Sequence, residues 1–89
     1  MNYTMIIEQG EAAWWGYIPD APGCAIGGET LAELLVVAPD VLAAHLEGCA
    51  PPAPRTLAEI LADPEVAENL DGSELFAPVA YDAAEVATV

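Results

Sequence analysis

The order of strand-like runs and turn signals in the first third of the chain limits its fold more than any other feature. Two short runs of strand-forming residues, Tyr3–Glu8 and Ala13–Ile18, flank a connection that contains a glycine. The loop that follows, Pro19–Cys24, contains two prolines and a glycine, so the second strand must end before it. A brief third run leads to Thr30 and Glu33, which stand at the two positions of a helix capping box. The sequence therefore predicts a hairpin, a third strand and a helix, in that order.

An amphipathic helix is predicted from Thr30 to Gly48. Its apolar residues recur at spacings of three and four, which places them on one stripe of a helix, and Gly48 is a natural stop. Pro39 interrupts the run, and a proline inside a helix costs roughly 3 kcal/mol. Because the stripe keeps its phase, we expect a kink or a short break there. We expect the stripe to be mostly buried, with these members: Leu31, Leu34, Leu35, Val41, Leu42 and Leu46.

The second half of the chain is punctuated by prolines and acidic residues. Residues 51–54 contain three prolines and form a stiff, extended connector. Thr56 and Glu59 then form a second capping box, which predicts a short helix. The apolar run Leu75–Tyr81 is predicted to be the last strand, and Pro78 favours a sheet edge or a bulge because it has no ladder donor.

The charge of the chain indicates what kind of partner it binds. The 89 residues carry a net charge of −14, with one arginine and no lysine. Because Lys and Arg supply most nucleic-acid affinity, we expect no direct binding to DNA or RNA. The same charge attracts basic partners. Solubility alone also explains an acidic composition, so charge by itself leaves both interpretations open.

The chain is predicted to be a cytoplasmic protein with one small domain. A length of 89 residues fits a single core, and we expect the domain to span residues 1–82 with a tail at residues 83–89. The start of the chain lacks the features of a signal peptide, and no run approaches the roughly 20 apolar residues that span a membrane. Cys24 and Cys49 are too few for a disulfide scaffold, and cytoplasmic thiols are normally reduced.

These features together resemble the HicB-type antitoxins. The resemblance is carried by Tyr3 with its apolar neighbours, the aromatic second strand, the Pro19–Cys24 loop and Gly28–Thr30 before the helix. It continues at residues 45–47 and returns at Leu75–Tyr81, where the family places its last strand. The resemblance implies an α+β, partial ribonuclease-H-like fold. Such a fold has a three-stranded antiparallel sheet, a fourth strand parallel to the first and beside it, and one main helix packed on one face.

The resemblance implies a binding protein and not an enzyme. HicB-type antitoxins bind and neutralise a small, basic, mRNA-cleaving toxin called HicA, and this chain would do so by masking the RNA-binding and active surface of the toxin. Many family members carry a C-terminal DNA-binding module. This chain ends at Val89 without a basic one, so we expect a stand-alone N-terminal domain. The alternative is an orphan protein without a toxin, and for both functions we expect a homodimer or a higher homo-oligomer.

No catalytic, cofactor-binding or metal-binding residue is predicted. Ribonuclease-H chemistry needs clustered carboxylates on the central strands, but Met5 and Ile6 occupy the centre of the first strand. His45, the only histidine, lies within the apolar stripe without a suitably spaced nucleophile, so we expect it to be a packed helix residue. Outward aromatic residues and an acidic segment are typical of an interface. The predicted partner-binding residues are Trp14, Trp15, Tyr17, Glu59, Asp63, Glu65 and Glu68.

Overall fold

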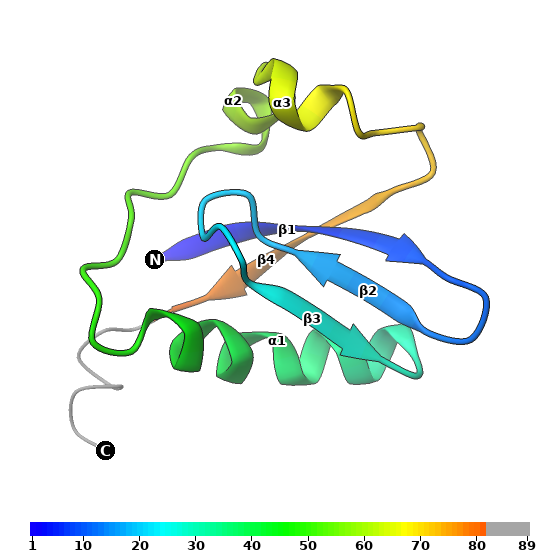
Figure 1. Cartoon of the computed structure of the whole chain (residues 1–89), viewed down its shortest axis with the longest axis horizontal. Coiled ribbons are helices and arrows are strands. Elements are labelled where there is room, and N and C mark those ends of the chain that lie inside the picture. The colour runs from blue at the N-terminus through cyan, green and yellow to red at the C-terminus, as the bar shows by residue number, and fades with distance from the viewer. Residues whose placement is uncertain (82–89) are drawn as a thin grey trace.

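A four-stranded sheet separates two helical layers in the computed structural model, which describes residues 1–81 (Figure 1). Helix α1 covers one face of the sheet, which we call the inner face, and the short helices α2 and α3 lie over the opposite, outer face. In chain order the elements are β1 (Asn2–Gln9), β2 (Trp14–Tyr17), β3 (Ala25–Gly28), α1 (Leu31–Leu46), α2 (Leu57–Leu61), α3 (Pro64–Ala67) and β4 (Leu75–Ala80).

The sheet has the strand order β3-β2-β1-β4, and all its pairings within residues 1–81 are antiparallel. The predicted α+β class and strand order are confirmed, but the predicted parallel fourth strand is wrong. Asn2 pairs with Ala80 and Ile7 pairs with Leu75, so β4 runs opposite to β1. The direction of β4 follows from the path of the chain between α1 and β4. Helix α1 returns the chain toward the start of β1, and residues 47–74 then cross the outer face to the other end of the sheet (Figure 1). The chain therefore enters β4 from the end at which β1 finishes.

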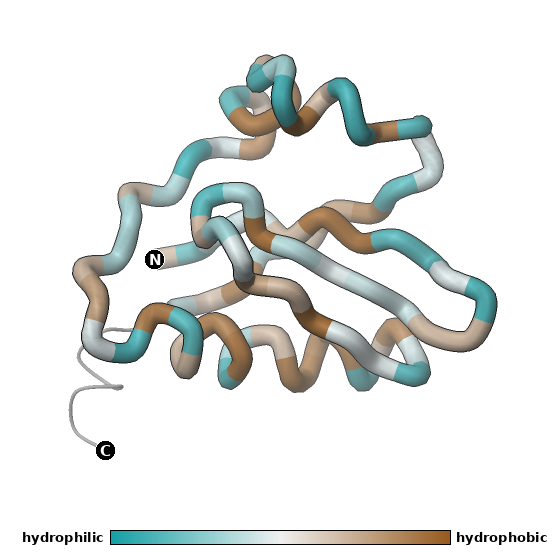
Figure 2. The backbone as a smooth tube through the Cα atoms, in the orientation of Figure 1, coloured by the Kyte–Doolittle hydropathy of each residue, from teal (hydrophilic) through white to brown (hydrophobic). Residues whose placement is uncertain are grey.

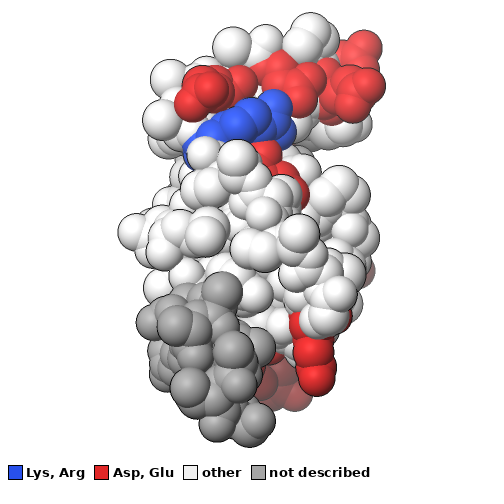
Figure 3. Space-filling model, turned by 90° about the vertical axis from the view of Figure 1, so that its left-hand side faces the viewer, with Lys and Arg blue, Asp and Glu red and all other residues white. Residues whose placement is uncertain are grey.

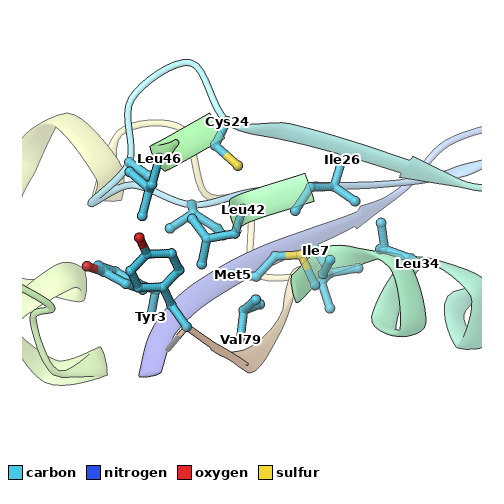
Figure 4. Packing of buried hydrophobic residues seen from close by; sticks show 13 residues of the cluster. Tyr3, Met5, Ile7, Cys24, Ile26, Leu34, Leu42, Leu46 and Val79 are labelled. Atoms are coloured by element: carbon cyan, nitrogen blue, oxygen red, sulfur yellow. The ribbon is translucent and has the colours of Figure 1, made fainter. Parts of the chain in front are cut away.

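The main core lies between the inner face and α1. Alternate side chains of β1 point toward α1, which meets them with residues one turn apart (Figure 4). Gly28 permits the close approach of β3 to α1, since a Cβ there would lie only 2.7 Å from the backbone nitrogen of Leu34. The buried members of this core are Tyr3, Met5, Ile7, Ile18, Ala21, Cys24, Ile26, Leu34, Ala38, Leu42, Leu46, Val79 and Tyr81.

Helix α1 runs from Leu31 to Leu46 as one helix, although Pro39 lies inside it. Its start is confirmed, because the hydroxyl oxygen of Thr30 accepts a hydrogen bond of 3.0 Å from the backbone N–H of Glu33. The expected stop also lies at the predicted place, since Gly48 follows the last turn with a φ of +78°. Such a left-handed conformation favours glycine and ends a helix.

The predicted buried stripe of α1 is partly correct. Leu35 is 41% exposed, so its predicted burial is wrong. The buried row follows every fourth residue, and Leu35 lies about 100° around the helix from Leu34 because a turn takes 3.6 residues. Ala38, four residues after Leu34, is the buried residue of the next turn. The other predicted members are either buried (Leu34, Leu42 and Leu46) or half-buried (Leu31 and Val41).

A smaller apolar cluster attaches α2 and α3 to the outer face. Ile6 of β1, Ile60 of α2 and Val66 of α3 are buried together, and Tyr17 and Leu70 pack against them. Figure 2 shows that hydrophilic residues alternate with hydrophobic ones over α2 and α3. Ile60 is the buried residue of α2 and Val66 the buried residue of α3, whereas Leu57 and Leu61 of α2 remain exposed.

The local signals in the second half of the chain are confirmed. Thr56 and Glu59 make both hydrogen bonds of the capping box that begins α2, and β4 with its Pro78 is an end strand of the described sheet. The predicted tail, residues 83–89, lies outside the described residues.

Candidate functional site

The outer face is the part of the sheet that α1 leaves uncovered. Successive side chains of a strand point to opposite faces, so the neighbouring tryptophans separate. Trp14 packs partly buried against the inner core, whereas Trp15 is 55% exposed. Tyr17 shares the face of Trp15 and is half-buried in the outer cluster. Of the three predicted aromatic residues, the structure thus brings Trp15 and Tyr17 together and turns Trp14 away.

The indole ring of Trp15 lies across the sheet surface. A Cβ on Gly27 of β3 would stand 2.9 Å from the ring atom Cζ3, and a Cβ on Gly10 would stand 3.2 Å from Nε1. The ring therefore covers the glycine in the neighbouring strand and reaches back to the β1–β2 turn. This leaves one large aromatic surface exposed on the outer face, which is the kind of group enriched in protein interfaces.

The environment of Tyr17 changes its acidity. Burial is the main cause that raises the pKa of Tyr17, and the carboxylates of Glu8 and Glu74 raise it further. The phenol thus stays protonated and can donate a hydrogen bond across the pH range in which proteins fold. It has no carboxylate-rich metal site beside it: residues 1–81 contain no group of three or more His, Cys, Asp or Glu side chains placed to hold a metal ion.

Two of the four predicted acidic residues have structural roles. The Glu59 side chain accepts the backbone N–H of Thr56 at 3.0 Å, and this hydrogen bond lowers the pKa of Glu59. Asp63 caps α3 by accepting the backbone N–H of Glu65 at 3.0 Å. Glu65 and Glu68 are exposed on α3 and at its end. The carboxylates available to a partner on this helix are therefore those of Glu65 and Glu68.

Arg55 makes contacts that the sequence did not predict. Its Nε donates to Asp20 Oδ1 at 2.6 Å, its backbone N–H donates to Asp20 Oδ2 at 2.7 Å, and its Nη1 donates to Asp63 Oδ2 at 3.0 Å. These side-chain hydrogen bonds raise the pKa of Arg55, with Asp20 as the larger cause. Figure 3 shows the single basic side chain enclosed by acidic ones at the α2–α3 end of the molecule. The sequence feature that could have indicated these contacts is that the chain has one Lys or Arg side chain and fifteen Asp or Glu side chains.

The Pro19–Cys24 loop is attached from two sides. Arg55 binds Asp20 of this loop from the connector, and the Asp20 side chain is only 5% exposed. The Nε2–H of His45, in the last turn of α1, donates to the backbone oxygen of Pro22 at 2.9 Å. His45 is exposed and not buried in the stripe, but its contact is structural. The loop thus anchors both the end of α1 and the arm formed by residues 55–67.

The outer face also has an apolar groove that the sequence pattern did not predict. It lies between α2 and β4 and is lined by Thr4, Leu57, Phe76, Ala77 and Pro78. In α2, Ile60 is buried, whereas Leu57 and Leu61 are each 40% exposed. The large exposed apolar side chains that line it are Leu57 and Phe76.

The solved structures that are similar to this chain include HicB antitoxins and their complexes. A chain of the HicA3 and HicB3 toxin–antitoxin complex matches with a TM-score of 0.70 and 27% identity, covering 92% of this chain and 99% of that chain. The antitoxin HicB3 matches with a TM-score of 0.74 and 26% identity, covering 96% and 65% respectively. The N-terminal domain of the Burkholderia pseudomallei antitoxin HicB matches with a TM-score of 0.73 and 20% identity, covering 92% and 99%.

The chain therefore has the fold of HicB antitoxins and corresponds to their N-terminal domain, which confirms the resemblance. It spans 65% of the length of HicB3. No protein-family model matches the chain, and no curated protein matches it significantly. None of the helices described in residues 1–81 is both long and apolar enough to cross a membrane.

Proposed function

We propose that this HicB-like chain is an antitoxin that binds a small, basic, mRNA-cleaving toxin of the HicA type and neutralises it by masking its RNA-binding and active surface. The observation that carries this proposal is the match to a chain of the HicA3–HicB3 complex at 27% identity over 92% of this chain. The function is binding and not catalysis, and it would take place in the cytoplasm, where mRNA is the target of such a toxin.

The charges of the chain support a basic partner. A net charge of −14 attracts a basic protein and speeds its association at low salt. The single arginine cannot serve as a nucleic-acid contact while two aspartates bind it. An acidic domain of this kind competes with RNA for the same basic surface of a toxin.

The outer face is the surface on which we place the partner. Trp15 supplies an exposed aromatic group, Tyr17 a polar tip, and Glu65 and Glu68 supply exposed carboxylates. The remaining predicted residues, Trp14, Glu59 and Asp63, contribute by stabilising the elements that present these groups.

The test is binding to the small basic protein encoded beside the gene of this chain. The toxin is produced as a catalytically inactive variant, and its affinity for the full chain is measured by calorimetry. We expect a stoichiometric complex that weakens as salt is added, and restored growth when the chain is co-expressed with the active toxin. The absence of such a neighbouring gene, or of binding, would overturn the proposal and favour the orphan homo-oligomer.

A further inference from the structure

The free edge of β4 has an interrupted set of backbone donors. Tyr81 and Met1 exchange hydrogen bonds of 2.8 and 3.0 Å, so the odd-numbered residues of β4 direct their backbone groups to β1. The even-numbered residues, Phe76, Pro78 and Ala80, direct theirs away from β1. Pro78 has no N–H to donate, and it stands in the middle of this set. Within residues 1–81 no strand pairs with this edge, and the missing donor disfavours the addition of one.

The side chains at this edge offer a different mode of contact. Phe76 and Pro78 line the groove from β4, and Leu57 lines it from α2. Phe76 is 38% exposed and Leu57 is 40% exposed, although both are apolar. Exposed apolar side chains that are contiguous in this way mark interaction surfaces. The groove is thus suited to receive an apolar side chain.

The negative charges near the groove favour a basic protein over a second copy of this chain as its occupant. Six of the fifteen acidic residues lie between residues 57 and 74, the segment that forms one wall and leads into β4. Arg55, the single Lys or Arg side chain, is engaged by Asp20 and Asp63. A second copy of this chain would bring a further fourteen net negative charges to this surface, whereas a basic protein meets carboxylates of which only Asp63 is paired with Arg55.

We propose that the groove between α2 and β4 is the docking site for an apolar side chain of the basic toxin, flanked on the toxin by cations that meet the acidic α2–α3 arm. This inference rests on the proposed antitoxin function and assigns the surface through which it acts. The toxin binds by side-chain contacts in the groove and not by adding a strand to β4.

The test compares two aspartate substitutions in apolar, exposed positions. Phe76→Asp places a charge in the groove, and Val36→Asp places the same charge on α1, where Val36 is 73% exposed on the other side of the molecule. Affinity for the catalytically inactive toxin is measured by calorimetry, with the thermal unfolding of each variant as the folding check. Loss of a central apolar contact typically costs a tenfold or larger factor. We expect Phe76→Asp to weaken binding about tenfold or more and Val36→Asp to change it by less than about twofold.

A second measurement does not depend on the stability of Phe76→Asp. A photo-crosslinking phenylalanine analogue is placed at residue 76 or at residue 36 of the otherwise unchanged chain, and we expect the toxin to crosslink from residue 76 only. Pro78→Ala restores the missing edge donor, so a gain in affinity for this variant would indicate strand addition and overturn the proposal.

The outcomes separate this inference from the proposed function. If the unchanged chain does not bind the toxin, the antitoxin function is wrong. If it binds but Phe76→Asp and Val36→Asp behave alike and residue 76 does not crosslink, the antitoxin function stands and the groove is not its docking site.

Discussion

At the scale of single residues, Arg55 connects three parts of the chain that are distant in sequence. Its guanidinium binds Asp20 of the loop and Asp63 of the α3 cap, while its backbone N–H binds Asp20 again. The Asp20 side chain is only 5% exposed, and both of its carboxylate oxygens accept hydrogen bonds from Arg55. A buried charge that loses its partner is strongly destabilising. Arg55 is thus a structural residue in spite of its position in a proline-rich connector.

We predict that Arg55→Met lowers the melting temperature by several degrees, because it leaves the Asp20 carboxylate with no guanidinium beside it. Arg55→Lys keeps the charge but cannot reproduce the forked geometry of the guanidinium. Its melting temperature should therefore lie between those of the unchanged chain and Arg55→Met. Differential scanning calorimetry measures both. A melting temperature unchanged by Arg55→Met would show that the contacts of Arg55 with Asp20 and Asp63 contribute nothing to stability.

The contribution of Asp63, which accepts a hydrogen bond from Arg55, to folding stability depends on pH with a defined sign. A hydrogen bond from Arg55, and then one from the N–H of Glu65, lowers the pKa of Asp63 below its ordinary 3.8. A group with a lowered folded-state pKa adds stability above its unfolded-state pKa and loses it as the pH falls through the folded-state value. We therefore predict that the stability difference between the unchanged chain and Asp63→Asn is constant above about pH 5 and shrinks progressively below it.

Urea titrations at several pH values measure this difference in the free energy of unfolding. Asparagine also caps helices well, so the substitution removes mainly the charge. Glu68→Gln, which removes an exposed carboxylate at the end of α3, is the matched control. A difference that grows as the pH falls would contradict the role assigned to Asp63.

At the scale of the elements, α1 supplies most of one layer with a single row of residues. Leu34, Ala38, Leu42 and Leu46 lie one turn apart and are buried. The flank of the helix is also apolar, yet Leu35 on that flank is 41% exposed. The contribution of each leucine to stability therefore depends on its place around the helix and not on its hydrophobicity.

Two truncations compare the stability contributed by the buried row of α1 with that contributed by the exposed flank of the helix. Leu42→Ala removes a fully buried side chain from the main core, and such changes cost about 2–5 kcal/mol in the free energy of unfolding. Leu35→Ala removes a side chain that remains in contact with water, so we predict a cost below about 1 kcal/mol. Chemical denaturation of both variants measures the contrast. Equal costs would mean that α1 is rotated from the orientation described.

At the scale of the whole molecule, a large net negative charge occurs together with exposed apolar side chains. The acidic side chains gather over the α2–α3 end and near α1, and uncharged surface lies between them (Figure 3). Trp15, Phe76 and Leu75 are exposed apolar residues of the sheet. The molecule thus has a surface able to associate and a net charge that opposes association with its own copies.

We predict that the chain self-associates, with a dimer as the smallest assembly, and that added salt strengthens the association because it screens the repulsion between copies. The contact should use the aromatic sheet face or the edge near Leu75–Tyr81, and not the acidic segment at residues 59–74. Sedimentation at tens of micromolar protein, about the range in which obligate assemblies stay intact, measures the mass in low and moderate salt. A monomer under all these conditions, or a dimer that dissociates as salt is added, would contradict the prediction.

The sequence by itself determined the features that depend on near neighbours. The two capping boxes, the end of α1 at a glycine and the loop that stops β2 all follow from hydrogen bonds and backbone preferences within a few residues. These local signals also carried the resemblance to the HicB antitoxins, which the similarity of the fold confirms. That Trp15 and Tyr17 share one face of the sheet was likewise predictable, because strands alternate their side chains, but alternation did not say which face α1 covers.

Only the tertiary structure decided the features that depend on distant contacts. The direction of β4 follows from the path of residues 47–74 over the outer face, and no local signal in Leu75–Tyr81 distinguishes a parallel strand from an antiparallel one. Arg55 and Asp20 are 35 positions apart, so their pairing could not be read from spacing. The groove arises where α2 and β4 meet, and Leu35 is exposed because the sheet covers a narrower arc of α1 than its apolar residues span. Periodicity says which residues share a face of an element, but packing decides how much of that face is covered.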